Sequence, residues 1–132
     1  LPDQTIFDFR FLFFPPYPSS SPIYHTLPLG FISEQINLDA RNRVIETKIM
    51  FTGMLLQTTV HPREIVKTAL ELGASAAIVS HNHPGGQLVF SDADHTLTHA
   101  LKRALATVDV RLLDHVLVAG GKTTTATEHG LI

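Results

Sequence analysis

The feature that most constrains the fold of this chain is a short apolar segment, residues 75–80, enclosed between two amphipathic helical patterns. Its residues, Ser-Ala-Ala-Ile-Val-Ser, are mostly small and apolar. They do not alternate between polar and apolar, as expected of a strand buried on both faces. The helical pattern before it begins at Pro62, where the missing N–H costs nothing, and stops at Gly73. The pattern after it runs from residue 91 to about residue 107. A buried strand between two helices predicts an α/β fold.

Further strands are expected on both sides of this unit. Residues 31–38 and 43–51 have strand-like composition, and the Asp-Ala-Arg-Asn sequence between them has the chemistry of a turn. Residues 111–118 and 122–127 form a second pair of expected strands, separated by two glycines. The resulting order β-β-α-β-α-β-β predicts a mixed β-sheet flanked by helices.

Composition changes near residue 30. Six of the eight prolines lie in the first 28 residues, and five of the eight phenylalanines lie in the first 14. Phenylalanines alternate with other residues between positions 7 and 13, as in a half-buried strand, and residues 15–22 resemble a polyproline-like linker. We therefore expect residues 1–29 to form a loosely packed arm and residues 30–132 to form the folded domain. The alternative is that the aromatic strand pairs with another chain, for example in a homodimer.

Charge and cysteine content exclude several classes of function. Ten Lys and Arg against twelve Asp and Glu give a net charge of −2, so direct binding of nucleic acid is not expected. The absence of cysteine excludes disulfides, thiolate metal sites and a cysteine nucleophile. No apolar run approaches about 20 residues and no secretory signal opens the chain, so we expect no membrane association and a cytoplasmic location. The eight histidines direct attention to metal binding.

The strongest candidate for chemistry directly follows the buried strand. His81 and His83 are two residues apart at the end of an extended segment, so their side chains project to the same side. Two imidazoles held together suit a divalent ion such as zinc, and Asp94 in the first turn of the next helix is placed to be a third ligand. Three protein ligands and a water form the open coordination of a catalytic zinc site. Asn82, between the histidines, is expected to line the site.

Some of these residues also have a purely structural interpretation. Ser91 and Asp94 have the spacing of a capping box at the start of a helix. His61 is expected at an N-cap position, with a place in the site lining as the alternative. Asp114 and His115 lie inside an apolar strand, where they form either a satisfied buried pair or part of the site.

Taken together, these motifs resemble the RadC family, which carries a JAMM (MPN-plus) metalloprotease-type domain. The likeness rests on the Val-His-Pro-Arg-Glu-Ile run at 60–65, the His-Asn-His-Pro-Gly-Gly run at 81–86, Ser91 with Asp94, and the Leu-Leu-Asp-His run at 112–115. It covers about residues 38–132 and implies a cytidine-deaminase-like sheet between helices.

The resemblance also implies a function. It places a zinc ion on His81, His83 and Asp94, and assigns Ser91 to the stabilisation of the substrate oxyanion. The implied activity is zinc-dependent hydrolysis of peptide or isopeptide amide bonds in a peptide or protein substrate. The alternative is a catalytically impaired zinc-binding module associated with DNA repair or mobile elements.

Two positions depart from the family pattern. Gly85 stands where the family usually has serine. The family's general-base glutamate lies about eight residues before the aspartate that ends the first strand, and Phe31 occupies that position relative to Asp39. The nearest acid is Glu34, five residues before Asp39, which an unbroken strand turns to the other face. Glu34 is the candidate base only if a bulge between residues 34 and 39 restores its direction.

Overall fold

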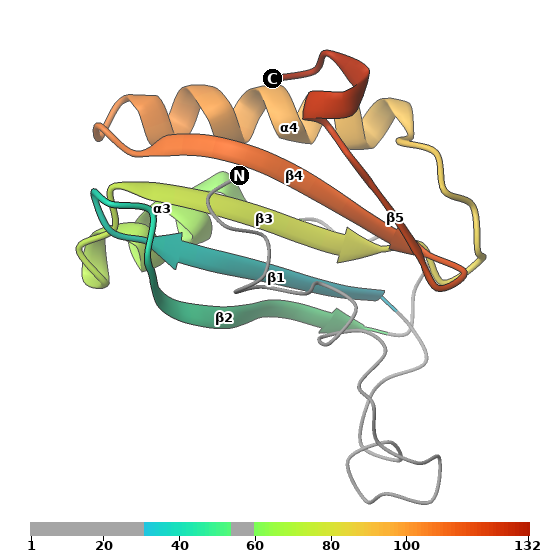
Figure 1. The fold of residues 1–132 in the computed structure, drawn as a ribbon, viewed down its shortest axis with the longest axis horizontal. Helices are drawn as coiled ribbons and strands as arrows, with labels where there is room; N and C mark the ends of the chain where they lie inside the picture. Colours follow the sequence, from blue (N-terminus) through green and yellow to red (C-terminus); the bar gives the residue numbers. More distant parts are fainter. Residues whose placement is uncertain (1–30, 54–59) are drawn as a thin grey trace, which may run out of the picture.

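The computed structural model describes residues 31–53 and 60–132, which form a five-stranded mixed sheet (Figure 1). The β1–β2, β1–β3 and β4–β5 pairs are antiparallel. The β3–β4 pair is parallel, because a helix connects the two strands. This is the mixed α/β sheet that the sequence predicts. In sheet order, the strands are β2 (Val44–Gly53), β1 (Phe31–Leu38), β3 (Ala76–Asn82), β4 (Arg111–Ala119) and β5 (Lys122–Thr125).

Both helices of the described region pack on the same face of the sheet. Ile65 and Ala69 of α3 (Pro62–Glu71) share one buried cluster with Leu101 and Leu105 of α4 (Asp92–Ala106). The strand residues in that cluster include Ala77 and Val79 of β3. We call the face to which these side chains point the helix face. The expected flanking helices are therefore present, and those in the described ranges lie on one side.

The opposite side of the sheet, here called the second face, has its own apolar cluster. Every residue in it belongs to β1, β3 or β4, and all are at most 5 % exposed. The members are Ile36, Leu38, Ala76, Ile78, Val116 and Val118. Apolar residues on both sides of β3 explain why its sequence shows no alternation.

The predicted boundaries differ from the structure at two places. β3 continues to Asn82, so His81 belongs to the strand and not to the following loop. The last expected strand, 122–127, ends at Thr125 and is followed by the 3-10 helix η1 (Thr127–His129). The Asp114 carboxylate accepts a hydrogen bond from the Thr127 N–H, which favours this bend away from the sheet.

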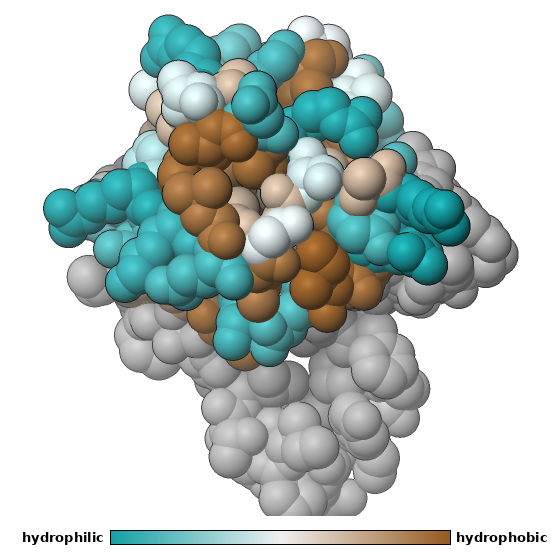
Figure 2. All heavy atoms as spheres, turned by 90° about the vertical axis from the view of Figure 1, so that its left-hand side faces the viewer, coloured by the Kyte–Doolittle hydropathy of each residue, from teal (hydrophilic) through white to brown (hydrophobic). Residues whose placement is uncertain are grey.

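The C-terminal end of β3 and the start of α4 meet at one end of the domain, on the right in Figure 1. Figure 2 looks at the opposite end, where hydrophobic surface lies among hydrophilic side chains. Leu70, near the end of α3, is 56 % exposed. Among the described residues, no helix combines the length and apolar character needed to cross a membrane. The arm predicted at 1–29 lies outside the described residues.

Candidate metal centre

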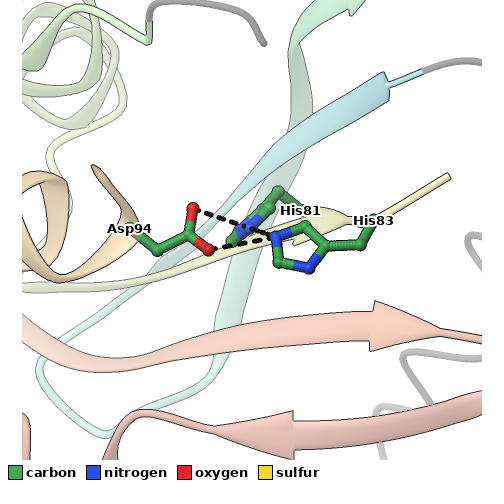
Figure 3. A group of neighbouring side chains, drawn as sticks. All are labelled: His81, His83 and Asp94. Atoms are coloured by element: carbon green, nitrogen blue, oxygen red, sulfur yellow. Dashed lines mark hydrogen bonds and ion pairs between the residues drawn. The ribbon is translucent and has the colours of Figure 1, made fainter. Parts of the chain in front are cut away.

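Three side chains converge where β3 ends and α4 begins. The two carboxylate oxygens of Asp94 lie 3.1 Å from His81 Nε2 and 3.0 Å from His83 Nε2 (Figure 3). The two Nε2 atoms are 3.2 Å apart. His81 is 3 % exposed, whereas His83 is closer to the surface. The structure thus brings together the three residues that the spacing identified as candidate ligands.

The separations between these atoms are close to those between the ligands of a metal ion. Ligands bonded at about 2.0–2.1 Å to a tetrahedral ion are separated by about 3.3 Å, close to the 3.0–3.2 Å observed. The Nδ1 atom of His83 lies 2.8 Å from the Gln87 carbonyl oxygen. A carbonyl can only accept, so Nδ1 carries a proton and Nε2 is the ring nitrogen of His83 that is available to a metal ion. The donor set therefore fits a divalent ion.

Asp94 is held by the helix start as well as by the cluster. Its side chain accepts from the Ser91 N–H at 2.8 Å, and its own N–H donates to Ser91 Oγ at 3.1 Å. The predicted capping box is therefore present, and it coexists with the ligand geometry. Burial disfavours the charged carboxylate, but its close contact with the His81 side chain and its hydrogen bonds at Ser91 hold the Asp94 pKa well below its usual range.

A buried polar layer lies directly behind His81. Its Nδ1 is 2.7 Å from Nε2 of His115 on β4, and Nδ1 of His115 is 2.7 Å from the hydroxyl of Thr98 on α4. Burial, with the neighbouring His81 acting in the same direction, lowers the pKa of His115 to about 3, so its ring is neutral. Phe90 packs its edge or face against both rings, at centroid distances of 6.4 Å to His81 and 5.5 Å to His115.

Sequence reasoning missed Thr98 and Phe90. Thr98 lies four residues after Asp94, so it is on the same side of α4, and this spacing is a signal that could have found it. Phe90 has no comparable signal, because it ends an irregular loop and its apolar contacts, Leu117 and Ala126, are distant in sequence.

Glu34 lies on the other side of the sheet from the candidate ligands. In the β1–β3 ladder Ser33 is opposite His81 and Glu34 is opposite Ser80, with no interruption between Ser33 and Leu38. Residues directly opposite each other share a face, so Glu34 points to the second face. The two irregularities beside β1 insert their extra residues, Ile45 and Met50, in β2. The bulge that would turn Glu34 to the cluster is therefore absent from β1.

Burial dominates the chemistry of Glu34. The residue is 2 % exposed, and its Oε2 atom has no hydrogen-bond partner. This desolvation raises the pKa of Glu34 from its ordinary value of 4.5 to about 7.

The remaining candidates have structural contacts away from the cluster. Asn82 accepts from the Ile32 N–H at 2.7 Å and so ties β1 to the end of β3. Asp114 accepts from the N–H groups of His115 and Thr127. His61 stands at the N-cap of α3 without a side-chain capping bond. It lines a cavity that shares no residue with the three candidate ligands.

The loop that joins the two histidines to Asp94 has glycine at position 85, where the family usually has serine, and its backbone accommodates either residue. Gly85 has an ordinary backbone conformation, and a Cβ added there meets no atom within 4 Å. Gly86, by contrast, has φ +83°, which disfavours any other residue.

Comparison with known proteins gives a consistent result. The family model described as RadC-like JAB domain matches residues 34–131. A UPF0758 protein of Nitrosospira multiformis is 56 % identical over 97 residues, covering 74 % of this chain and 43 % of that protein. The UPF0758 protein YkfG of Escherichia coli is 46 % identical over 95 residues, covering 72 % of this chain and 60 % of YkfG. The chain thus spans less than two thirds of the length of these relatives.

Proposed function

Because the chain belongs to the family of RadC-like JAB domains, as its motifs predict, we propose that it is a zinc-dependent hydrolase of peptide or isopeptide amide bonds. The observation that carries the proposal is the convergence of His81, His83 and Asp94 at separations that suit the ligands of one metal ion. Three protein ligands leave coordination positions for water and a substrate carbonyl.

The residues of the chain have distinct tasks in this proposal. His81, His83 and Asp94 hold the ion, and zinc bound there supplies a Lewis acid for an amide carbonyl. The Ser91 hydroxyl accepts from the Asp94 N–H, which leaves its own proton available to donate to a developing oxyanion. Its place at the N-terminus of α4 adds the positive end of the helix dipole to that stabilisation.

A zinc-binding module without turnover is the second candidate, and the orientation of Glu34 favours it. Amide hydrolysis needs a group that accepts and returns a proton, an effect worth about 10²–10⁴ in rate. Glu34 points to the second face, and within the described ranges the ligand group contains Asp94 as its sole carboxylate. An association of such a module with DNA repair or mobile elements stays a prediction.

One set of assays separates the two candidates. Zinc-loaded wild type, His83→Ala and Glu34→Gln are compared on linear peptide and isopeptide substrates, with zinc content measured in parallel. The hydrolase proposal expects turnover in the wild type that is lost in His83→Ala. Stoichiometric zinc without turnover supports the module, whereas the absence of bound zinc contradicts both. Turnover that is unaffected in Glu34→Gln assigns the proton transfer to another group.

A further inference from the structure

A chain of three hydrogen bonds runs behind the candidate ligands from α4 through β4 to β3. Thr98 Oγ1 lies 2.8 Å from the main-chain oxygen of Asp94 and 2.7 Å from His115 Nδ1. His115 Nε2 lies 2.7 Å from His81 Nδ1. Thr98, His115 and His81 are 0 %, 2 % and 3 % exposed, so their polar atoms are shielded from water and need partners within the protein.

The direction of every bond in this chain follows from its first member. A carbonyl oxygen only accepts, so the Thr98 hydroxyl donates its single proton to Asp94. Thr98 must then accept from Nδ1–H of His115, and a ring with this single proton, buried at 2 % exposure, presents its Nε2 atom as an acceptor. His81 therefore donates through Nδ1–H, which leaves the lone pair of its Nε2 directed at His83 and Asp94.

We propose that Thr98 and His115 are positioning residues that hold His81 in its Nδ1–H tautomer and aim its Nε2 lone pair at the metal. The inference deepens the proposed function and rests on it for the presence of the metal. The tautomer itself is a property of the metal-free chain. Hydrogen bonds of this kind behind a metal-binding histidine fix its ring orientation and raise its basicity.

The same chain also couples two of the ligand-bearing elements. It starts at the main chain of Asp94 on α4 and ends at the ring of His81 on β3, with β4 between them. The separation of the two ligands is therefore fixed before an ion arrives. This lowers the reorganisation that accompanies metal binding and raises affinity.

The first test reads the tautomer without any metal. Long-range ¹H–¹⁵N NMR correlations of the histidine rings are recorded on metal-free protein at about pH 8, where ordinary imidazoles are neutral. We expect the His81 ring to carry its proton on Nδ1. A His81 proton on Nε2 in the wild type overturns the inference, and this result requires no variant to fold.

The second test compares substitutions of similar volume on α4. Thr98→Val removes the hydroxyl and Thr98→Ser keeps it. Thr96→Val changes an exposed threonine two residues earlier in the same helix. Zinc affinity is measured by competition with a chromophoric chelator. We expect Thr98→Val to weaken zinc binding about 10–100-fold and to lose the Nδ1–H preference of His81. Thr98→Ser and Thr96→Val should stay close to wild type.

The outcomes separate this inference from the proposed function. Wild-type zinc affinity and an unchanged His81 tautomer in Thr98→Val would overturn the positioning role. A loss of affinity that Thr98→Ser does not restore would also overturn it, because the effect would then come from packing alone. If the tautomers change as expected but wild-type protein binds no zinc, the proposed function fails while the hydrogen-bond chain stands.

Discussion

Buried polar side chains on the two faces of β1 and β3 differ in how fully they are hydrogen-bonded. On the helix face, His81 belongs to a continuous chain through His115 and Thr98 to the main chain of α4. On the second face, Glu34 and Ser80 stand opposite each other across the β1–β3 ladder. Both are at most 2 % exposed, yet Oε2 of Glu34 and Oγ of Ser80 have no hydrogen-bond partner in the structure.

This contrast shows that burial by itself does not identify a functional polar residue. A buried polar group that is hydrogen-bonded can define the position of its neighbours, whereas an unsatisfied one is destabilising by about 1–3 kcal/mol. The chain behind His81 belongs to the first kind. Glu34 belongs to the second, and its raised pKa reports the free energy of desolvation rather than a position near the candidate ligands.

The largest effect is expected from removing a ligand on the helix face. His83→Ala should reduce bound zinc from about one ion per chain to none, because two ligands do not complete the site. It should also abolish the rise in melting temperature on adding zinc, which reflects about 2.7 kcal/mol when the free zinc is 100 times the Kd. Metal analysis and thermal melts measure both. His99→Ala, an exposed histidine on α4, is the matched control. If the His83→Ala variant still binds zinc, His83 is not a ligand.

A second effect of comparable size is expected on the second face. The folded-state pKa of Glu34 is raised from 4.5 to about 7, so the folded chain keeps a proton that the unfolded chain has lost. The free energy of unfolding should therefore fall by roughly 3 kcal/mol as the pH rises from about 4.5 to about 7, and stay low above that. Glu34→Gln, which is neutral at every pH, should remove this contribution and be more stable than wild type at about pH 8.

Urea unfolding at about pH 5 and about pH 8 measures this difference. Glu46→Gln is the control, since Glu46 is an exposed residue on β2 and should leave the pH dependence as in wild type. Equal pH dependence in wild type and Glu34→Gln would show that Glu34 finds a hydrogen-bond or charge partner in the folded protein, and the contrast between the faces would disappear.

The sequence predicts the parts of the fold that depend on local pattern. The uninterrupted apolar run of β3 indicates burial on both faces, and the spacing of His81, His83 and Asp94 brings three candidate ligands together. Period-2 alternation also predicts that Glu34 in an unbroken strand points to the face opposite the candidate ligands, and the register confirms it. Each of these properties is determined by residues that are close in sequence.

Features that depend on tertiary partners could not be predicted in this way. Gln35 and Asn37 in β1 are buried on the helix face, where Gln35 Nε2 donates to the Asn37 side chain and to the Ile65 main chain of α3. Polar residues are normally unfavourable there, and the distant Ile65 carbonyl offsets part of that cost, while Oε1 of Gln35 has no hydrogen-bond partner in the structure. The spacing of Thr98 from Asp94 indicates only that the two share a side of α4, whereas its bond to His115 depends on a strand that follows the helix.

The smallest expected effect concerns Ser91, which is exposed at the edge of the candidate metal centre. Its hydroxyl accepts from the Asp94 N–H, so Ser91→Ala should lower the free energy of unfolding by about 1 kcal/mol. Ser91→Asp should keep most of that stability, since a carboxylate also caps a helix, but it lacks a proton to donate to an oxyanion. Thermal melts and amide-hydrolysis rates on both variants separate the two roles. Reduced hydrolysis in both, with reduced stability in Ser91→Ala alone, is the result expected if one hydroxyl serves as cap and as oxyanion donor. Equal hydrolysis in wild type and both variants would leave helix capping as the sole role of Ser91. Its hydroxyl would then contribute to stability alone, unlike the hydrogen-bonded groups behind His81.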